Sequence, residues 1–230
     1  MTSPKCRTVL HQLKSLSNPQ NVQGMARFGI NPKNTYGITI PALRRIAHSL
    51  ASDHELALEL WESGIHEARI LASLIDAPAR VSSRQMNLWA SEFDSWDVCD
   101  QCCSNLFDKT PYAKSKAVEW SSRKEEFVKR AGFTLMAALA VHDKEASDFQ
   151  FIRFLRIIEQ QSDDDRNFVK KSVNWALRQI GKRNARLNKS AIATANEILR
   201  RNSKAAHWIA SDALRELQSR QVQRRLREMP

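Results

Sequence analysis

Phe127-Val128-Lys129-Arg130 recurs 41 positions later as Phe168-Val169-Lys170-Lys171, and each copy opens a long segment with helical spacing of its apolar residues. A weaker match relates Ala213-Leu214-Arg215 to Ala176-Leu177-Arg178. Repeats of this length, built from paired helices, are typical of HEAT-like solenoids. The pattern therefore predicts an all-α superhelix in which each repeat contributes its second helix to a concave wall. Chance similarity among amphipathic helices is the alternative interpretation.

Helix signals extend over the whole chain. Gly and Pro are scarce, at 6 and 7 residues, and strand-like alternation is almost absent. Ser52-Asp53-His54-Glu55 and Ser82-Ser83-Arg84-Gln85 have the form of capping boxes. We predict one HEAT-like domain over residues 1–230, with residues 216–230 as a basic helical tail. The predicted helices span residues 4–17, 21–28, 40–51, 53–63, 65–76, 82–93, 95–108, 111–121, 124–142, 147–160, 165–182, 187–201 and 203–226.

Composition excludes several classes of protein. The sequence has no apolar run of about 18 residues, which a membrane helix requires, and its start lacks the layout of a signal peptide. We therefore expect a cytoplasmic protein without a membrane partner. A single C-x-x-C, with no second pair to complete a zinc site, predicts reduced, packed thiols and no metal centre; the four cysteines are Cys6, Cys99, Cys102 and Cys103.

Positive charge is concentrated in the second half of the chain. The net charge is +11; residues 1–115 carry 12 Lys and Arg against 11 Asp and Glu, and residues 116–230 carry 24 against 14. The segment 166–196 holds no acidic residue and eight cations: Arg166, Lys170, Lys171, Arg178, Lys182, Arg183, Arg186 and Lys189. Such a run is often only a solvated face, but without compensating anions it favours a polyanion-binding surface, most simply nucleic acid.

The stretch Ser95-Trp96-Asp97-Val98-Cys99-Asp100 carries the best candidate chemistry. In a helix, Trp96 and Asp100 lie on the same face, one turn apart. A carboxylate beside a large π-face suits a substrate that becomes cationic as it reacts. When the repeats are aligned with one another, comparable positions are occupied by Arg69, Asp100, Arg130 and Lys171. We expect these four residues to face one groove.

These residues, with others in the same order, resemble the AlkD-type DNA glycosylases, HEAT-like proteins that excise alkylated bases. The matching pieces are Met25-Ala26-Arg27-Phe28, Tyr36-Gly37-Ile38-Thr39-Ile40-Pro41-Ala42-Leu43-Arg44, Trp96-Asp97-x-x-Asp100, Phe127-x-x-Arg130 and Lys171-Ser172-Val173-Asn174-Trp175-Ala176-Leu177-Arg178. They span residues 25–178, which is most of the chain. No single piece is very specific, and the ordered set is considerably more so.

The resemblance implies roles for individual residues. Asp100 matches the catalytic aspartate, Trp96 and Trp175 match the two tryptophans that contact the lesion sugar, and Arg130 matches an arginine that holds the DNA backbone. Phe28 stands where the best-known members have a tyrosine. The resemblance, the run of cations and the alignment of the repeats together give the residues expected to bind DNA: Arg130, Lys171, Arg178, Phe28, Arg69, Lys170 and Lys182.

The predicted function is that of a monomeric glycosylase for 3-methyladenine and 7-methylguanine in double-stranded DNA, which needs no metal or cofactor and leaves the lesion stacked. Two alternatives stay open: a non-catalytic relative that binds distorted or branched DNA, and a HEAT-type protein-interaction scaffold. Asp97 is interpreted as a first-turn anion of a helix capped by Ser95. The remaining tryptophans are assigned to packing: Trp61, Trp89, Trp120 and Trp208.

Overall fold

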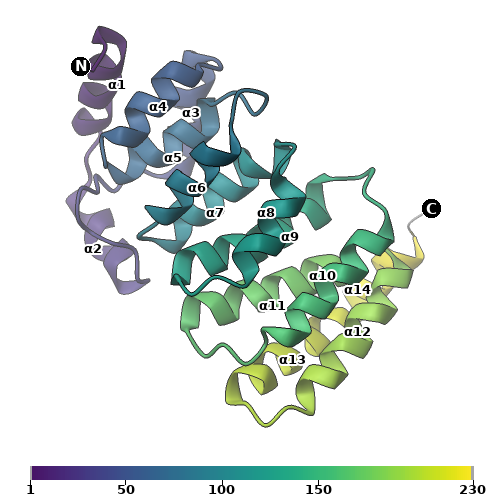
Figure 1. Cartoon of the computed structure of the whole chain (residues 1–230). Coiled ribbons are helices and arrows are strands. Elements are labelled where there is room, and N and C mark those ends of the chain that lie inside the picture. Colours follow the sequence, from purple (N-terminus) through teal and green to yellow (C-terminus); the bar gives the residue numbers. More distant parts are fainter. Residues whose placement is uncertain (1, 229–230) are drawn as a thin grey trace. The chain divides into compact units, whose positions relative to one another are not determined.

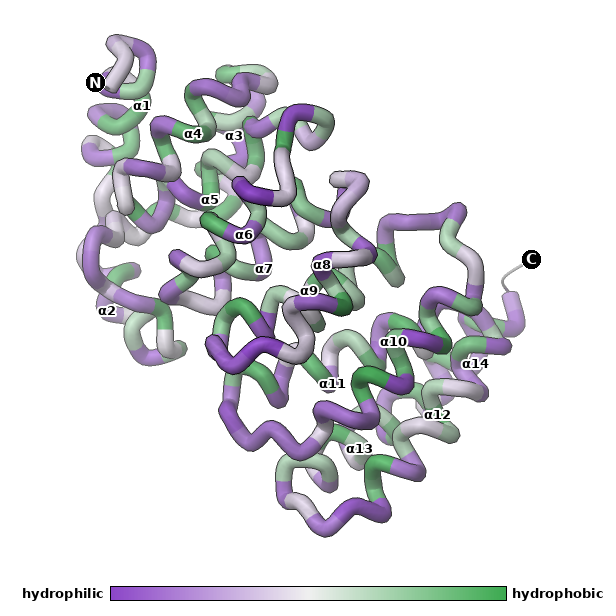
Figure 2. The backbone as a smooth tube through the Cα atoms, in the orientation of Figure 1, coloured by the Kyte–Doolittle hydropathy of each residue, from purple (hydrophilic) through white to green (hydrophobic). Residues whose placement is uncertain are grey.

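The computed structural model describes residues 2–228. Within this range the regular structure is helical, as predicted, and the chain divides into two compact units, Met1–Pro111 and Tyr112–Pro230. Figure 1 shows the course of the chain through these helices, and Figure 2 shows hydrophobic and hydrophilic residues alternating along them, as amphipathic helices require.

The first unit consists of seven α-helices and one 3-10 turn in the described part of residues 1–111. They are α1 (Pro4–Ser15), α2 (Pro19–Arg27), α3 (Ile40–Leu50), α4 (His54–Glu62), α5 (His66–Ile75), α6 (Ser83–Ser91), α7 (Trp96–Asn105) and η1 (Phe107–Lys109). Helix α5 packs against α3, α4 and α7. The stacked indoles of Trp61 and Trp89 fill the space between α4 and α6, with ring centroids 4.0 Å apart and an interplanar angle of 3°.

The second unit consists of α8 (Ala113–Ser121), α9 (Glu126–His142), α10 (Asp148–Gln160), α11 (Asn167–Gly181), α12 (Ala185–Leu199), α13 (Lys204–Leu217) and α14 (Arg220–Arg227). Helix α9 packs on α8 and α11, and α11 also packs on α13. Within each unit the second helices of successive pairs are therefore neighbours: α5 contacts α7, α9 contacts α11, and α11 contacts α13. This is the predicted repeat arrangement.

A glycine permits the close contact between α8 and α9. An added Cβ on Gly132 would lie 2.5 Å from the backbone nitrogen of Ser121 and 2.9 Å from its Cα. Because both atoms belong to the backbone, no side-chain rotation can relieve this contact. Gly132 therefore sets the spacing of this helix pair.

The predicted cap at Ser82 is confirmed, because its side chain accepts the backbone N–H of Gln85. In the other predicted capping box, Asp53 and not Ser52 is the cap, and its carboxylate accepts the N–H of Leu56. The predicted helix 203–226 is wrong, because the chain ends α13 at Leu217 and begins α14 with Ser219 as a new cap. Two residues of the predicted basic tail, 229 and 230, lie outside the described residues.

Candidate functional site

The turn that precedes α7 is fixed by the loop that follows α2. The buried hydroxyl of Ser95 accepts the backbone N–H of Asn31 at 2.9 Å, and the Asn31 side-chain amide donates to Asp94 at 2.6 Å. Ser95 occupies the N-cap position of α7 but makes no side-chain cap bond there. The Ser95 side chain was expected to cap its own helix, but it links two segments that are distant in the sequence.

The same loop is also held by Glu67, whose role was not predicted from the sequence. Its fully buried carboxylate accepts the backbone N–H groups of Tyr36 at 2.8 Å, Gly37 at 2.6 Å and Ile38 at 3.2 Å. Gly37 has φ +75°, and a Cβ there would lie 2.4 Å from the carbonyl oxygen of Asn18. Glu67 and Gly37 therefore fix this loop in one conformation.

Trp96 lies against Phe28 at a pocket of about 610 Å³ in the first unit. Its indole Nε1 donates to the Phe28 carbonyl oxygen at 3.1 Å, and the residue is partly exposed. Phe28 is 72% exposed, which is unusual for a side chain of this size. Phe28 and Trp96 therefore lie together at this pocket. The walls of the pocket are mainly apolar, with Met25, Ile30 and Ile38 among them.

His66 and Asp97 form a buried pair at the inner wall of this pocket. His66 Nε2 lies 2.9 Å from Asp97 Oδ2, and the two side chains are 3% and 14% exposed. Burial lowers the pKa of His66, but the hydrogen bond and the charge of Asp97 outweigh it, so that the pKa is raised above its ordinary value. Asp97 lies in the first turn of α7, as predicted, but its pairing with His66 was not predicted. Nothing in the local pattern pairs two residues 31 positions apart.

Asp100 lies one turn beyond Trp96 on α7. Both residues are partly exposed, whereas Val98, Cys99 and the following cysteines of α7 are fully buried. The helix therefore presents Trp96 and Asp100 on its outward side and its apolar residues to the core, as the spacing predicts.

In the second unit, α11 carries a stripe of residues spaced by 4, 3 and 4 positions: Lys171, Trp175, Arg178 and Lys182. These four side chains are exposed or partly exposed, while Val173, Ala176 and Leu177 are buried. The spacing keeps the stripe on one side of the helix. The predicted tryptophan and three predicted cations therefore share one surface.

Several of these cations are bound to other residues of the same unit. The carboxylate of Glu216 forms ion pairs with both Arg178 and Lys182. Burial raises the pKa of Glu216, but the hydrogen bonds and charges of these two cations outweigh this effect and lower it. Lys170 Nζ lies 5.2 Å from the ring centroid of Trp208, which is 40% exposed. The assignment of Trp208 to core packing is therefore wrong.

Arg130 is 6% exposed and donates to the carbonyl oxygen of Phe168 at 2.7 Å, near the start of α11. This bond ties α9 to α11 at the two repeat copies from which the fold was predicted. Lys171 on the same helix is exposed. Of the predicted cations of the second unit, Lys171 therefore presents its charge most openly.

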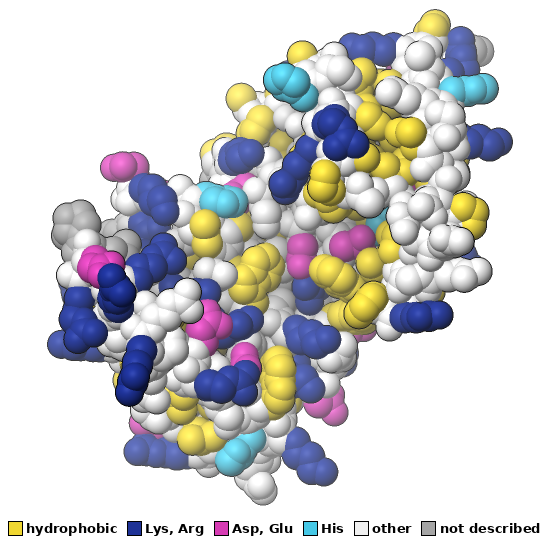
Figure 3. All heavy atoms as spheres, turned by 180° about the vertical axis from the view of Figure 1, so that it is seen from behind, with side chains coloured by type: hydrophobic (Ala, Val, Ile, Leu, Met, Phe, Trp, Pro, Cys, Tyr) yellow, Lys and Arg dark blue, Asp and Glu magenta, His cyan; other side chains and the backbone are white. Residues whose placement is uncertain are grey.

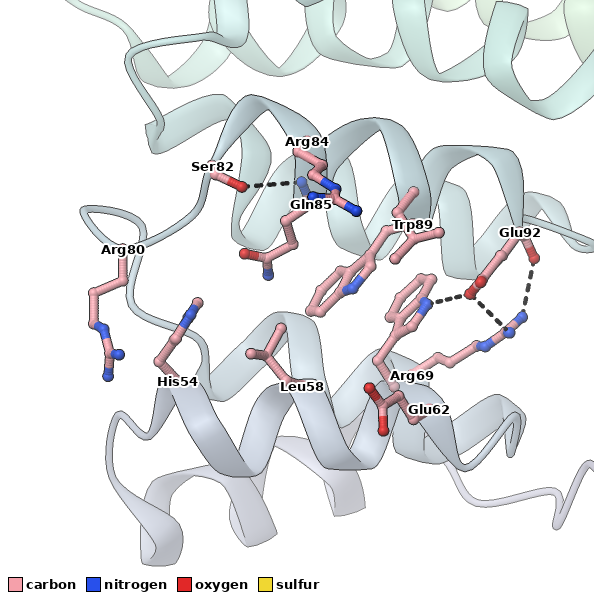
Figure 4. A pocket seen from close by; sticks show the side chains of 12 residues that line it. His54, Leu58, Glu62, Arg69, Arg80, Ser82, Arg84, Gln85, Trp89 and Glu92 are labelled. Atoms are coloured by element: carbon pink, nitrogen blue, oxygen red, sulfur yellow. Dashed lines mark hydrogen bonds and ion pairs between the residues drawn. The ribbon is translucent and has the colours of Figure 1, made fainter. Parts of the chain in front are cut away.

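Arg69 does not join the Trp96 pocket. It lines a different pocket of about 440 Å³, between α4 and α6, where its guanidinium donates to the backbone and side chain of Glu92 and lies 5.0 Å from the Trp61 ring (Figure 4). The alignment of the repeats predicted one groove for Arg69 and Asp100. His66 and Ile70, on the same helix, do line the Trp96 pocket.

The thiols are free and buried, as predicted. Burial raises the pKa of Cys102 and Cys103 well above the ordinary value, which keeps both thiols protonated and unreactive. Within residues 2–228, no three His, Cys, Asp or Glu side chains are placed to hold a metal ion. No helix in this part of the chain is long and apolar enough to cross a bilayer.

Comparisons with known proteins agree with this geometry. A family model described as DNA alkylation repair enzyme matches residues 9–217. A solved structure described as belonging to a new family of proteins related to the HEAT-like repeat DNA glycosylases, with affinity for branched DNA structures, superposes with a TM-score of 0.76 at 20% identity. The superposition covers 92% of this chain and 95% of the other. The uncharacterized protein Lin0241 of Listeria innocua is 26% identical over 128 residues, which is 54% of this chain and 57% of that protein's length.

Proposed function

Because the chain belongs to the DNA alkylation repair enzyme family, we propose that it is a DNA glycosylase for cationic alkylated purines in duplex DNA. The observation that carries the proposal is the placement of Trp96 and Asp100 together on the outward side of α7, where Trp96 lines an apolar pocket. The proposed substrates are 3-methyladenine and 7-methylguanine, whose positive charge makes them good leaving groups.

The proposed role of Asp100 is electrostatic. Breaking the N-glycosidic bond develops oxocarbenium character on the deoxyribose. A carboxylate held near that sugar stabilises the developing cation and orients the attacking water. Because the leaving base is already cationic, no strong general acid is needed. A site built from one carboxylate and indole rings then suffices, without a metal or cofactor.

The tryptophans are proposed to hold the sugar. An indole face stabilises a cationic sugar in the manner of a cation–π interaction, worth about 0.5–2 kcal/mol. The bond from the Trp96 Nε1 to the Phe28 carbonyl oxygen restrains the ring before substrate arrives. This restraint reduces the entropy that ordering of the ring would cost on binding. Trp175, in the cation stripe of α11, is proposed to make the second contact.

Backbone binding is proposed to come from the second unit, through Lys171, Arg178, Lys182 and Lys170, whereas the buried Arg130 is proposed to position the start of α11. Contacts of this kind position DNA without reading its sequence. They leave the lesion stacked in the duplex if the enzyme works from the sugar side, as we propose. Phe28 is proposed to contact the DNA beside the lesion through its exposed ring.

The test is release of free base from duplex DNA that contains 7-methylguanine, without added metal, at a rate above spontaneous depurination. Undamaged duplex serves as the control substrate. Failure to exceed the spontaneous rate, with duplex binding intact, contradicts the glycosylase proposal.

A DNA-binding role without catalysis is the second candidate. It is favoured by the structural similarity to a protein with affinity for branched DNA. A three-way junction bound much more tightly than a linear duplex, without base release, supports this second role. The presence of Asp100, Trp96 and Trp175 favours the first.

A further inference from the structure

A second cationic feature lies at one end of the second unit. A pocket of about 370 Å³ is formed where α9 and α11 end, where α12 begins, and along α14. Four of its lining residues are cations and none is acidic: Lys144, Lys182, Arg183 and Arg225. We call this site the cation pocket.

Arg183 gives the cation pocket a fixed positive charge. Its guanidinium donates to the carbonyl oxygens of Ala140, Lys144 and Ala146, each at 3.1 Å, and lies 4.5 Å from the ring centroid of Phe151. The three acceptors are neutral backbone carbonyls, so these bonds position the guanidinium and leave its charge in place. The nearby Asp143 is ion-paired with Lys114 at 2.9 Å, although it also feels the charge of Arg183.

Lys144 and Arg225 supply the exposed charges of the pocket. Both are exposed, and the Lys144 ammonium donates to the Val141 carbonyl oxygen at 2.6 Å, a neutral partner. Lys182 is the member that pairs with a carboxylate, that of Glu216. The pocket therefore keeps a net positive charge and has two exposed cationic donors, an arrangement that suits a phosphate group.

The composition and packing of α14 indicate which class of phosphate compound the pocket binds. The helix carries Arg220, Arg224, Arg225 and Arg227, and its two apolar residues, Val222 and Leu226, are buried. A helix that binds a membrane must insert an apolar face, and here that face is already used in packing. Figure 3 shows many Lys and Arg side chains at this end of the unit. A nucleic-acid backbone in water fits this surface, and a lipid headgroup does not.

We propose that the cation pocket binds a backbone phosphate of DNA other than the one that Lys171 contacts. Lys182 is eleven positions beyond Lys171 on α11, which places the pocket about 16 Å farther along the helix axis. One phosphate follows another at about 3.4 Å of axial rise on a strand. The contact is therefore made with a different phosphate from that of Lys171. The proposed contact enlarges the DNA footprint of the second unit and does not depend on the chemistry of Asp100.

The experiment compares the double variant Lys144→Gln/Arg225→Gln with the control Arg153→Gln/Arg156→Gln. The control removes the same charge from exposed positions of α10 outside the pocket. Affinity for a duplex of about 24 base pairs is measured at several salt concentrations, with base release at saturating DNA measured in parallel. The pocket variant should bind several-fold more weakly, with a salt slope reduced by about 1, and should release base at the parent rate when saturated.

Equal affinity and equal salt slope in the pocket variant, the control and the parent would overturn the proposal. Loss of binding to anionic phosphatidylglycerol vesicles, with unchanged DNA binding, would also overturn it and point to a lipid. Because binding is measured independently of base release, an inactive parent protein leaves this test intact. Thermal unfolding of both variants verifies that the exposed substitutions preserve the fold.

Discussion

The imidazole Nε2 of His66 lies 2.9 Å from Asp97 Oδ2, which joins the first turn of α5 to the first turn of α7. Asp97 follows Trp96 directly and precedes Asp100 by three positions. The pair is therefore in a position to hold the start of α7, and with it the two residues to which we assign the chemistry. Asp94 and Glu67 also act on His66 through their charges.

This pair predicts a pH-dependent stability. The pKa of His66 is raised in the folded protein, so its contribution is fully present below the unfolded value of about 6.5. It is lost as the pH rises through the higher folded value. His66→Gln should lower the free energy of unfolding by about 1–3 kcal/mol at low pH and by less at high pH. Urea unfolding across this range measures the difference, with the exposed His11→Gln as control. A pH-independent difference would contradict the assignment.

Asp100→Asn should slow base release by about 10²–10³-fold and leave duplex affinity unchanged or slightly higher. The substitution keeps size and hydrogen-bonding capacity but removes the charge that favours an oxocarbenium-like transition state. Single-turnover release of 7-methylguanine gives the rate. Glu62→Gln, at the pocket that Arg69 lines, is the matched control and should behave as the parent. A parent-like rate in the Asp100 variant would make the carboxylate structural.

Lys171→Gln should weaken duplex binding on all sequences alike. If about six phosphates are contacted, the parent slope of log K against log salt is near −5, and this variant should reduce its magnitude by about 1. Lys189→Gln removes the same charge from an exposed position on α12, a first helix of its pair. It should leave the slope nearly unchanged. Equal effects of the two substitutions would argue for diffuse attraction and against a specific contact by Lys171.

Asp164 predicts an acid-sensitive element of the second unit. Burial raises its pKa, but the hydrogen bonds and charges of Arg166 and Lys129 outweigh this and lower it to about 2. The stabilisation, about 2 kcal/mol, is present above the unfolded value of about 3.9 and is lost as the pH falls toward 2. Asp164→Asn should therefore lower stability at neutral pH and converge with the parent near pH 2. The exposed neighbour Asp165→Asn should have little effect at either pH.

Two glycine substitutions test the packing of α8 on α9. Gly132→Ala should destabilise by about 1–3 kcal/mol or more, because the new methyl group meets backbone atoms of Ser121. The helical glycine Gly24 has no atom within 4 Å of an added Cβ. Gly24→Ala should therefore be neutral or stabilising by up to about 1 kcal/mol. Thermal unfolding of both variants measures the contrast, and a stabilising Gly132→Ala would show that the two helices can separate without cost.

Local signals identified most helices correctly. Caps such as Ser82, prolines in first turns and the 3.6-residue period act within a few residues, so they are visible in the sequence. The break between α13 and α14 was missed because Ser219 begins α14 without a glycine or proline before it. The free, buried cysteines and the outward side of α7 were predicted for the same local reason.

The sequence by itself determined the all-helical repeat, the basic second half, and the placement of Trp96 with Asp100 on one helix face. Only the tertiary structure decided which residues from distant segments meet. It paired His66 with Asp97, gave Glu67 to the loop at Tyr36 and Gly37, and placed Arg69 beside Glu92. A repeat offset fixes which helix a residue belongs to. Successive side chains are turned by about 100° around the helix axis, so the exact position of a residue in its helix decides which neighbour its side chain contacts.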